Sequence, residues 1–305
     1  MYDLIGDIHG HADQLEQLLC KLGYQRSQGG YRHPERQVIF LGDFIDRGPK
    51  IRQVLETVRP MIDEGAALAV MGNHELNALA YHTEKPGSPG EFLRPHTPKN
   101  EKQIRQTIAQ LNSGELREAL EWFRTLPLWL DLPGLRAVHA CWYRPAIIAI
   151  TPELERHQGI TPEFLHSACV DGGELFAPVE TVLKGKEVPL PEGVSFQDKD
   201  GHVRTRTRVR WYLSPEGHSY RSYAMTDQIE SDRPLEVAVA DAAEPYPSDA
   251  KPVFFGHYWL TPNQPQPLAR NIACLDYSVA KGGFLCAYRW NGEQELVSDN
   301  FVWTE

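Results

Sequence analysis

Short apolar runs alternate with helical patterns over the first 140 residues. Runs at 2–5, 38–41 and 68–71 have the length and apolar character of buried strands, and each is followed by Gly-Asp or Gly-Asn. After the first run, apolar residues recur at the spacing of a helix buried on one face: Leu15, Leu18, Leu19 and Leu22. A second such stripe follows Pro49, a residue favoured in first helical turns: Ile51, Val54, Leu55, Val58 and Ile62. This alternation predicts βαβ units.

The later part of the chain changes character. A Pro- and Gly-rich stretch at 83–99 predicts a loop, and two helical patterns then lead to a strand at 135–138. Prolines and charged residues are frequent from 145 to 250, and strand-like runs then resume at 253–255, 272–275, 284–288 and 295–302. We therefore predict an α/β fold in which N-terminal and C-terminal strands form two sheets. It comprises one domain over 1–305, with a core at about 1–144 and 251–305 and an inserted cap at about 145–250.

The composition is that of a globular protein, with 41% hydrophobic and 24% charged residues. The 31 Lys and Arg against 41 Asp and Glu give a net charge of −10, which argues against a groove for long nucleic acid. Five cysteines without CxxC spacing predict reduced thiols. The sequence lacks a signal-peptide pattern and a long apolar run, so we expect a cytoplasmic protein without membrane partners. The oligomeric state is left open.

Polar residues follow five of the predicted strands: Asp7 with His9, Asp43 with Asp46 and Arg47, Asn73 with His74, His139, and His257. Open α/β sheets bind ligands at the carboxyl ends of their strands, so these side chains are expected to converge. Asp and His bind divalent metals, and one carboxylate can bridge two ions about 3.5 to 4 Å apart. A single Asp before a helix is more often an N-cap, but five such clusters together favour a metal site.

The motifs GDIHG, GDFIDRG and GNHE, followed by strands ending in HA and GH, resemble those of the calcineurin-like metallophosphoesterases, specifically the phosphoprotein phosphatase superfamily. That superfamily includes serine/threonine protein phosphatases and bacterial diadenosine tetraphosphate hydrolases. The resemblance covers residues 1 to about 80, 135–140 and 253–290, and we recognise no resemblance in the cap. It implies a metallophosphoesterase-type β-sandwich of two mixed sheets flanked by helices.

The resemblance also implies a set of metal ligands. Asp7 and His9 would bind a first ion, and Asp43 would bridge both ions. The second ion would be bound by Asn73, His139 and His257. A shell of carboxylate, imidazole and amide groups suits two divalent ions, for which we expect manganese, with iron or zinc as alternatives.

Three further residues receive catalytic roles from the resemblance. His74 would donate a proton to the leaving group, and Asp46 would orient the imidazole of His74. Arg47 would hold phosphate oxygens with its planar guanidinium. The implied reaction is hydrolysis of phosphate monoesters by a hydroxide that bridges the two metals.

The cap contains an alternating segment with four arginines at every second position: Arg204, Arg206, Arg208 and Arg210. As a strand, this segment would place the four guanidinium groups on one face. One interpretation is a solvated edge strand that its charge protects from pairing. The alternative is a second phosphate-binding arginine, for which we select Arg210, with Arg144 as the rival candidate.

The sequence leaves three functions open. The first is a phosphatase acting on a phosphoprotein or a small phosphorylated substrate, favoured by Asp46 within GDFIDRG. The second is a diadenosine tetraphosphate hydrolase, because the segment GNHELNALA resembles that branch and the arginine-rich segment suits additional phosphates. The third is a catalytically inactive metal-binding scaffold, which has no evident reason to retain His74, Asp46 and Arg47 together.

Overall fold

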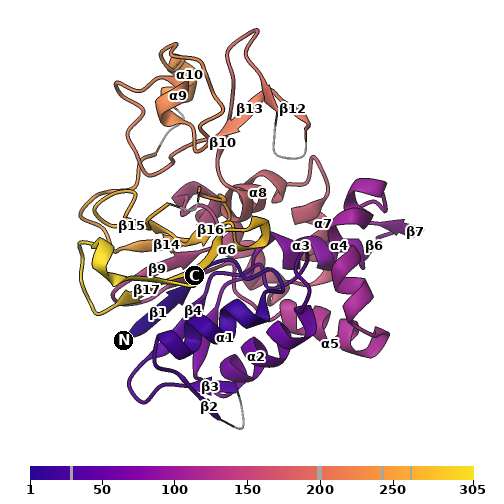
Figure 1. Cartoon of the computed structure of the whole chain (residues 1–305). Coiled ribbons are helices and arrows are strands. Elements are labelled where there is room, and N and C mark those ends of the chain that lie inside the picture. The colour runs from indigo at the N-terminus through magenta and orange to yellow at the C-terminus, as the bar shows by residue number, and fades with distance from the viewer. Residues whose placement is uncertain (28–29, 198–200, 242–243, 262) are drawn as a thin grey trace.

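Two mixed β-sheets form the centre of the computed structural model, which describes residues 1–27, 30–197, 201–241, 244–261 and 263–305 (Figure 1). The first sheet runs in the order β16 (Asp276–Tyr277), β17 (Phe284–Trp290), β1 (Tyr2–Ile5), β4 (Gln37–Phe40) and β5 (Ala67–Ala69), and β18 (Phe301–Trp303) pairs with β17. The second runs in the order β15 (Ile272–Cys274), β14 (Val253–Phe255), β9 (Arg136–Val138) and β8 (Trp129–Asp131). N-terminal and C-terminal strands thus share the first sheet, which confirms the predicted sandwich.

Each sheet contains three adjacent parallel strands. Strands β1, β4 and β5 run in one direction, and β9, β14 and β15 do the same in the second sheet. The alternating side chains of the strands enter two separate clusters. Leu4, Ile39 and Phe254 pack between the sheets, whereas Ile5 and Phe40 face the cluster under the helices. The carboxyl ends of all these parallel strands therefore carry the polar loops that follow them.

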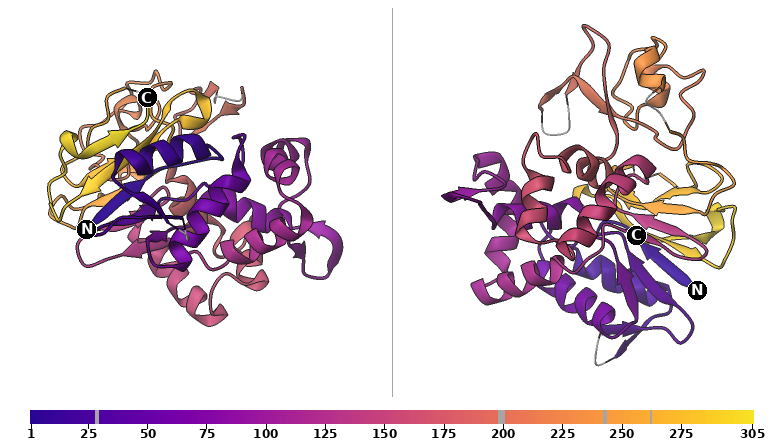
Figure 2. Two further views of the ribbon diagram at one scale, coloured as in Figure 1. Left: turned by 60° about the horizontal axis from the view of Figure 1, so that its bottom comes forward. Right: turned by 180° about the vertical axis from the view of Figure 1, so that it is seen from behind.

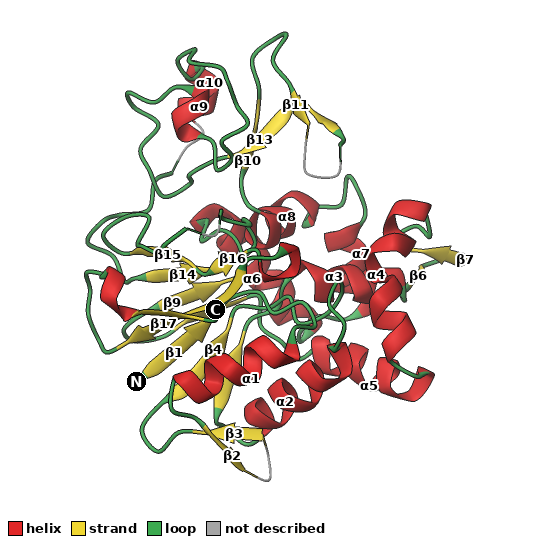
Figure 3. Ribbon diagram, in the orientation of Figure 1, coloured by secondary structure: helices red, strands yellow, loops and turns green. Residues whose placement is uncertain are grey.

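Helices cover the outer faces and lie mostly to one side of the sheets (Figure 3). In chain order they are α1 (Ala12–Lys21), α2 (Ile51–Asp63), α3 (Asn73–Tyr81), α4 (Pro98–Gln110), α5 (Ser113–Phe123), α6 (Arg144–His157), α7 (Pro162–Cys169) and α8 (Phe176–Lys184). The predicted apolar stripes of α1 and α2 are largely buried, as their spacing requires. Every residue of helix α3 is buried, so packing on all sides fixes the position of its first residues, Asn73 and His74.

Smaller elements complete the body. These are the hairpins β2 (Gln25–Ser27) with β3 (Gly30–Arg32) and β6 (Glu84–Lys85) with β7 (Ser88–Phe92), and two 3-10 turns at Val279–Lys281 and Ser298–Asn300. The stretch at 83–99 was predicted as a loop, and part of it pairs as the β6–β7 hairpin. The strand predicted over 295–302 was too long, because the turn at Ser298–Asn300 precedes β18.

The segment predicted as a cap packs in two different ways. Helices α6 to α8 contribute Ile150, Phe164 and Val179 to the main hydrophobic cluster and lie against the body (Figure 2). The rest projects beyond the body as a lobe formed by β10 (Glu187–Pro189), β11 (Phe196–Gln197), β12 (Val203–Arg204), β13 (Arg206–Arg208), α9 (Tyr220–Tyr223) and α10 (Val237–Asp241). This lobe has its own cluster, centred on Val188, Val209 and Tyr220. The alternating arginine segment is therefore two short strands rather than one continuous strand.

The cysteines and the helices agree with the predictions of free thiols and of no membrane-spanning segment. All five cysteines are free, and Cys141, Cys274 and Cys286 are buried as small apolar side chains. Within the described residues, every helix is too short or too polar to cross a bilayer.

A buried ionic cluster fastens the first strand to its neighbours. The Asp3 carboxylate is fully buried and accepts from Arg36 Nε at 2.9 Å, Tyr24 OH at 3.0 Å and Arg289 Nε at 3.1 Å. The Arg36 side chain is only 7% exposed, so its charge has little access to water. Each partner therefore depends on the others for its stability in the fold.

We predict that Asp3→Ala lowers the free energy of unfolding by about 3 to 5 kcal/mol, because the substitution leaves the buried Arg36 charge uncompensated. Urea denaturation followed by circular dichroism measures this change. Asp13→Ala removes an exposed ion pair with Lys50 and should cost about 1 kcal/mol or less. Equal losses in the two variants would contradict a special role for the Asp3 cluster.

Candidate active site

Strained backbone marks the loops at the carboxyl ends of the strands. Eight non-glycine residues have positive φ angles in the described chain, and six of them lie in or beside the predicted motifs: His9, Asp43, Asp46, Arg47, His257 and Trp259. Such conformations cost about 1 to 3 kcal/mol each and persist where the surrounding structure enforces them. Their concentration in three loops indicates a functional site.

Two glycines allow the loops to close around carboxylates. A Cβ atom on Gly256 would lie 1.9 Å from Asp7 Oδ1, and one on Gly72 would lie 2.2 Å from Asp43 Oδ1. No side chain fits at either position. The glycines of the GH and GNHE motifs are therefore required for close packing of the backbone against Asp7 and Asp43.

Asp43 lies at the centre of the site. Its Oδ2 atom is 3.5 Å from His9 Nε2, 3.5 Å from His139 Nε2 and 3.9 Å from His74 Nε2. Its other oxygen, Oδ1, accepts from the backbone N–H of His74 at 2.9 Å. One buried carboxylate oxygen is therefore directed at the ring nitrogens of three loops, which is the arrangement that a bridging metal ligand needs.

Backbone carbonyls fix the tautomers of two histidines. The Nδ1 atom of His9 lies 2.9 Å from the Ile45 carbonyl, and that of His139 lies 2.7 Å from the Leu41 carbonyl. Because a carbonyl only accepts, both Nδ1 atoms carry hydrogen, and Nε2 is the atom turned toward the site. The Nε2 atoms of His9 and His257 are buried and have no hydrogen-bond partner among the described residues. These orphaned atoms fit a metal site.

The electrostatics also suit a cation. Burial lowers the pKa of His9 and of His257, so both rings are neutral and able to act as ligands. Burial alone would raise the pKa of Asp43, but His139 and His74 hold it well below its ordinary range. Burial likewise opposes protonation of His139, yet the Asp43 carboxylate raises its pKa to about 10. The pocket therefore attracts positive charge.

Two overlapping ligand groups result. His9, Asp43 and His74 form one, and Asp43, His139 and His257 form the other, with the ligand atoms of each group within 4.8 Å of one another. Asp43 belongs to both. Asn73 Oδ1 lies 3.1 Å from His139 Nε2, and the Asp7 carboxylate accepts from the backbone N–H of His257 at 3.1 Å. The structure thus brings all six predicted ligands together.

His74 contacts its predicted partner, Asp46, and also Arg47. Its Nδ1 atom is 2.6 Å from Asp46 Oδ2, and its Nε2 atom is 3.1 Å from Arg47 Nη2. The same Nε2 atom is close enough to Asp43 to count geometrically as a metal ligand. The contact with Asp46 on one ring nitrogen and with Arg47 on the other matches the acid role that the sequence predicts.

Glu75 belongs to the GNHE motif but had no predicted role. Its buried carboxylate accepts from the backbone N–H groups of Asp43 at 2.9 Å, Phe44 at 2.8 Å and Gly72 at 3.0 Å. Burial raises the pKa of Glu75 to about 7, and the Asp43 charge adds to the effect. Glu75 thus ties the second and third motifs together, and its position three residues after Gly72 is the available sequence signal.

Trp259 and Asp276 were also missed. The Arg47 guanidinium lies 3.9 Å from the centre of the Trp259 ring, and the Lys281 ammonium lies 4.6 Å from it. Asp276 accepts from the backbone N–H of Trp259 at 2.8 Å, which supports its positive φ. In the sequence, Trp259 lies two residues after His257, and Asp276 lies directly after the strand-like run at 272–275.

The structure does not place Arg210 among the site residues. Its Nε atom donates to the Ala224 carbonyl at 3.1 Å, within the lobe. Arg144 is exposed at the start of α6. Burial and the charge of Arg208 lower the pKa of His257, and the buried Nε of Arg208 makes no hydrogen bond among the described residues, although it lies 3.8 Å from Glu187 Oε1. The continuous strand predicted for the four arginines is instead two short strands, β12 and β13, and Arg210 lies beyond the end of β13 at Arg208.

The chain belongs to the calcineurin-like phosphoesterases, whose family model matches residues 2–225. Over 73 residues it is 47% identical to an asymmetrical bis(5'-nucleosyl)-tetraphosphatase of Oceanobacillus iheyensis, a match that covers 24% of this chain and only 29% of that relative. Over 315 residues it is 24% identical to a symmetrical bis(5'-nucleosyl)-tetraphosphatase of Hamiltonella defensa, covering 96% of this chain and 95% of the relative. A cold-active protein tyrosine phosphatase shares the fold, with a TM-score of 0.52, 18% identity, and coverage of 94% and 73% of the two chains.

We predict that the metal-free protein binds two divalent ions and that Asp43→Asn lowers the occupancy of both sites, because Asp43 belongs to both ligand groups. His257→Ala should lower the occupancy of one site only. Titration with manganese followed by elemental analysis measures both effects. Loss of a single ion in Asp43→Asn would contradict the bridging role.

Proposed function

We propose that the chain is a dinuclear metal-dependent phosphatase that hydrolyses phosphate monoesters of a phosphoprotein or a small phosphorylated substrate. The observation that carries this proposal is the single carboxylate of Asp43, shared by two ligand groups beside a histidine that contacts an acid and an arginine. Membership of the phosphoesterase family supports it. An inactive scaffold would have no use for the His74 contacts.

Asp7, His9 and Asp43 would hold one ion, and Asn73, His139 and His257 would join Asp43 in holding the other. When bound, two divalent ions supply Lewis acidity that activates water and offsets the charge of the phosphate. Manganese is the proposed metal, with iron or zinc as alternatives, because the mixed oxygen and nitrogen donors suit all three.

His74 supplies the proton for the leaving group. Its Nδ1–H donates to Asp46 Oδ2, so the neutral ring accepts from Arg47 through Nε2. Once Nε2 is protonated, both His74 and Arg47 are donors, and their common partner must be an acceptor. An ester oxygen of the substrate meets that requirement, which places the leaving group between the two side chains.

Arg47 binds the phosphate oxygens and stays oriented by stacking on Trp259. Arg208 takes the second phosphate-binding role for which the sequence analysis selected Arg210. Arg204, Arg206 and Arg208 each lie within 4 Å of Glu187, at 3.6, 3.9 and 3.8 Å. Among the described residues, Arg206 and Arg208 of β13 share this one carboxylate, so β13 carries excess positive charge that suits additional phosphates.

That excess charge favours a second candidate function, the hydrolysis of a dinucleoside polyphosphate such as diadenosine tetraphosphate. Two relatives bear names of this activity. The phosphates that do not react would lie toward Arg208. The same core chemistry serves both candidates, and they differ in what the lobe binds.

We predict that manganese-loaded protein hydrolyses an aryl phosphate and that chelation abolishes the activity. His74→Asn should keep its metal content yet lose roughly 10²- to 10⁴-fold in kcat on an alkyl phosphate, whose poor leaving group needs a proton. The loss should be smaller on an aryl phosphate with a good leaving group. Equal losses on both substrates, measured by steady-state kinetics, would remove His74 from the acid role.

Arg208→Ala is expected to raise KM for a dinucleoside tetraphosphate roughly tenfold or more, because a charge-assisted contact is lost. KM for a small aryl phosphate should change little, and added salt should reduce the difference. Arg210→Ala is the matched control, since Arg210 donates to Ala224 within the lobe. The same KM increase in both variants, or in neither, would refute the role of Arg208.

A further inference from the structure

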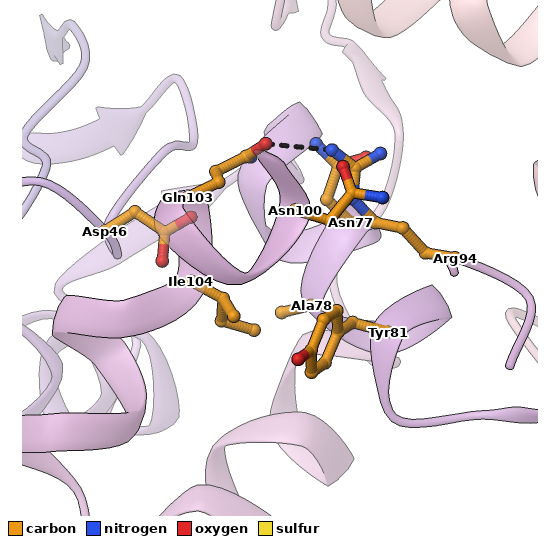
Figure 4. Close-up of a pocket in the computed structure, with 8 residues that line it drawn as sticks. All are labelled: Asp46, Asn77, Ala78, Tyr81, Arg94, Asn100, Gln103 and Ile104. Carbon is orange, nitrogen blue, oxygen red and sulfur yellow. Dashed lines mark hydrogen bonds between the residues drawn. The ribbon is translucent and has the colours of Figure 1, made fainter. Parts of the chain in front are cut away.

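A narrow polar crevice lies on the Nδ1 side of His74, between α3, α4 and the segment after β7 (Figure 4). It is too narrow to admit a water molecule. Its walls include Asp46, Arg94 and Gln103, together with the amide side chains of Asn77 and Asn100. The crevice therefore leads from the outer helices to the back of the catalytic histidine and carries polar groups along its length.

Arg94 and Gln103 form a chain of contacts that ends at His74. Arg94 Nη2 donates to Gln103 Oε1 at 2.8 Å, the dashed contact in Figure 4. Gln103 Nε2 lies 3.3 Å from His74 Nδ1. Because a guanidinium only donates, it holds the amide with the carbonyl toward Arg94 and the NH₂ group toward His74.

The direction of this amide matters for the single proton on Nδ1. That proton is donated to Asp46 Oδ2, at 2.6 Å. An amide oxygen in the place of Gln103 Nε2 would compete with Asp46 for the proton and allow the ring to tilt. With the NH₂ group there, Asp46 is the acceptor that remains, and Nε2 stays directed at Arg47.

Helix α4 also fixes the carboxylate partner. Thr107, one turn after Gln103, donates its hydroxyl to Asp46 Oδ1 and accepts from the backbone N–H of Asp46 at 3.1 Å. One face of α4 therefore controls both members of the His74–Asp46 pair.

The partial burial of Arg94 indicates that its hydrogen bond to Gln103 is important. Burial lowers the pKa of Arg94, an effect that the charges of Glu180 and Asp46 partly oppose, and no ion pair of Arg94 is found among the described residues. Placing a guanidinium there without an ion pair is unfavourable unless its hydrogen bonds are used. Its bond to Gln103 is such a use.

We propose that Arg94 and Gln103 are positioning residues for His74, holding its imidazole so that Nε2 faces the leaving group. This inference rests on the proposed phosphatase function. It assigns part of the acid machinery to residues outside the three sequence motifs, in α4 and in the segment after β7.

Kinetics on two substrates tests the proposal. Gln103→Leu removes the amide that packs beside His74 Nδ1, so the ring is free to tilt even without a competing oxygen. This variant should lower kcat on an alkyl phosphate roughly tenfold with KM unchanged, and should change kcat on a good aryl leaving group less than roughly twofold. Arg94→Leu should show the same pattern, since it frees the amide to rotate. Gln106→Leu, the same substitution at an exposed position of α4, should behave as wild type.

Gln103→Glu distinguishes the effect of filling the space beside His74 from the effect of which atom, NH₂ or oxygen, faces Nδ1. The side chain keeps its shape and its contact with Arg94, but it presents an oxygen to His74 Nδ1, so the selective loss on the alkyl phosphate should remain. A normal alkyl-to-aryl ratio in Gln103→Glu and Gln103→Leu would overturn the proposal. Inactivity of the wild type on both phosphates would instead refute the proposed function.

Proton NMR of the metal-free protein gives a readout that needs no turnover. The Nδ1–H resonance of His74, identified by its absence in His74→Asn, should be sharp in the wild type and in Gln106→Leu. It should broaden in Gln103→Leu and Arg94→Leu as the ring becomes mobile. An unchanged resonance in both variants would overturn the positioning role even if the wild type is an active phosphatase.

Discussion

A buried carboxylate needs positive charge or hydrogen-bond donors around it, but three loops place further acceptor atoms beside Asp43. Lone pairs of His9 Nε2, His139 Nε2 and Asn73 Oδ1 converge on or beside its Oδ2 atom. Such a set of acceptors repel one another unless a proton or a cation lies among them. The pKa of His139 is raised to about 10 for the same reason, because a proton on this ring places positive charge beside the Asp43 carboxylate. The loops are arranged so that a positive charge can be held beside Asp43 Oδ2.

Holding these groups together strains the backbone, and the surrounding fold compensates. Positive φ angles at His9, Asp43 and His257 turn their side chains inward. Glu75 holds the Asp43 loop through backbone N–H groups, and the parallel strands fix where each loop begins. The strain is therefore distributed over a rigid sandwich, which is the condition under which a preorganised site persists.

The sequence predicted those parts of the fold and site that local patterns encode. The run before Asp43 is apolar and ends in glycine, so both the strand and its polar end could be read directly. By contrast, Arg94 reaches Gln103 through the turn of the segment 93–97 that joins β7 to α4, and no spacing in the sequence records that contact. Alternation placed Arg208 and Arg210 on one face, but it could not show where the strand stops. Trp259 likewise became part of the site only through a turn held by Asp276.

The residues that local patterns predict and those that they miss form two groups, and each group meets a different physical requirement. The ligands around Asp43 must satisfy the fixed geometry of cations and a phosphate, so they fall in short motifs at strand ends. The groups that orient His74 or bind the rest of a substrate have only to reach the site from outside, which many elements can do. In this chain the residues proposed for the first purpose lie in α4 and the segment after β7, and Arg208, proposed for the second, lies in β13. The arginines of the lobe contact Glu187, a residue of the lobe itself, so groups that bind the rest of a substrate can change there while the ligands around Asp43 stay in place.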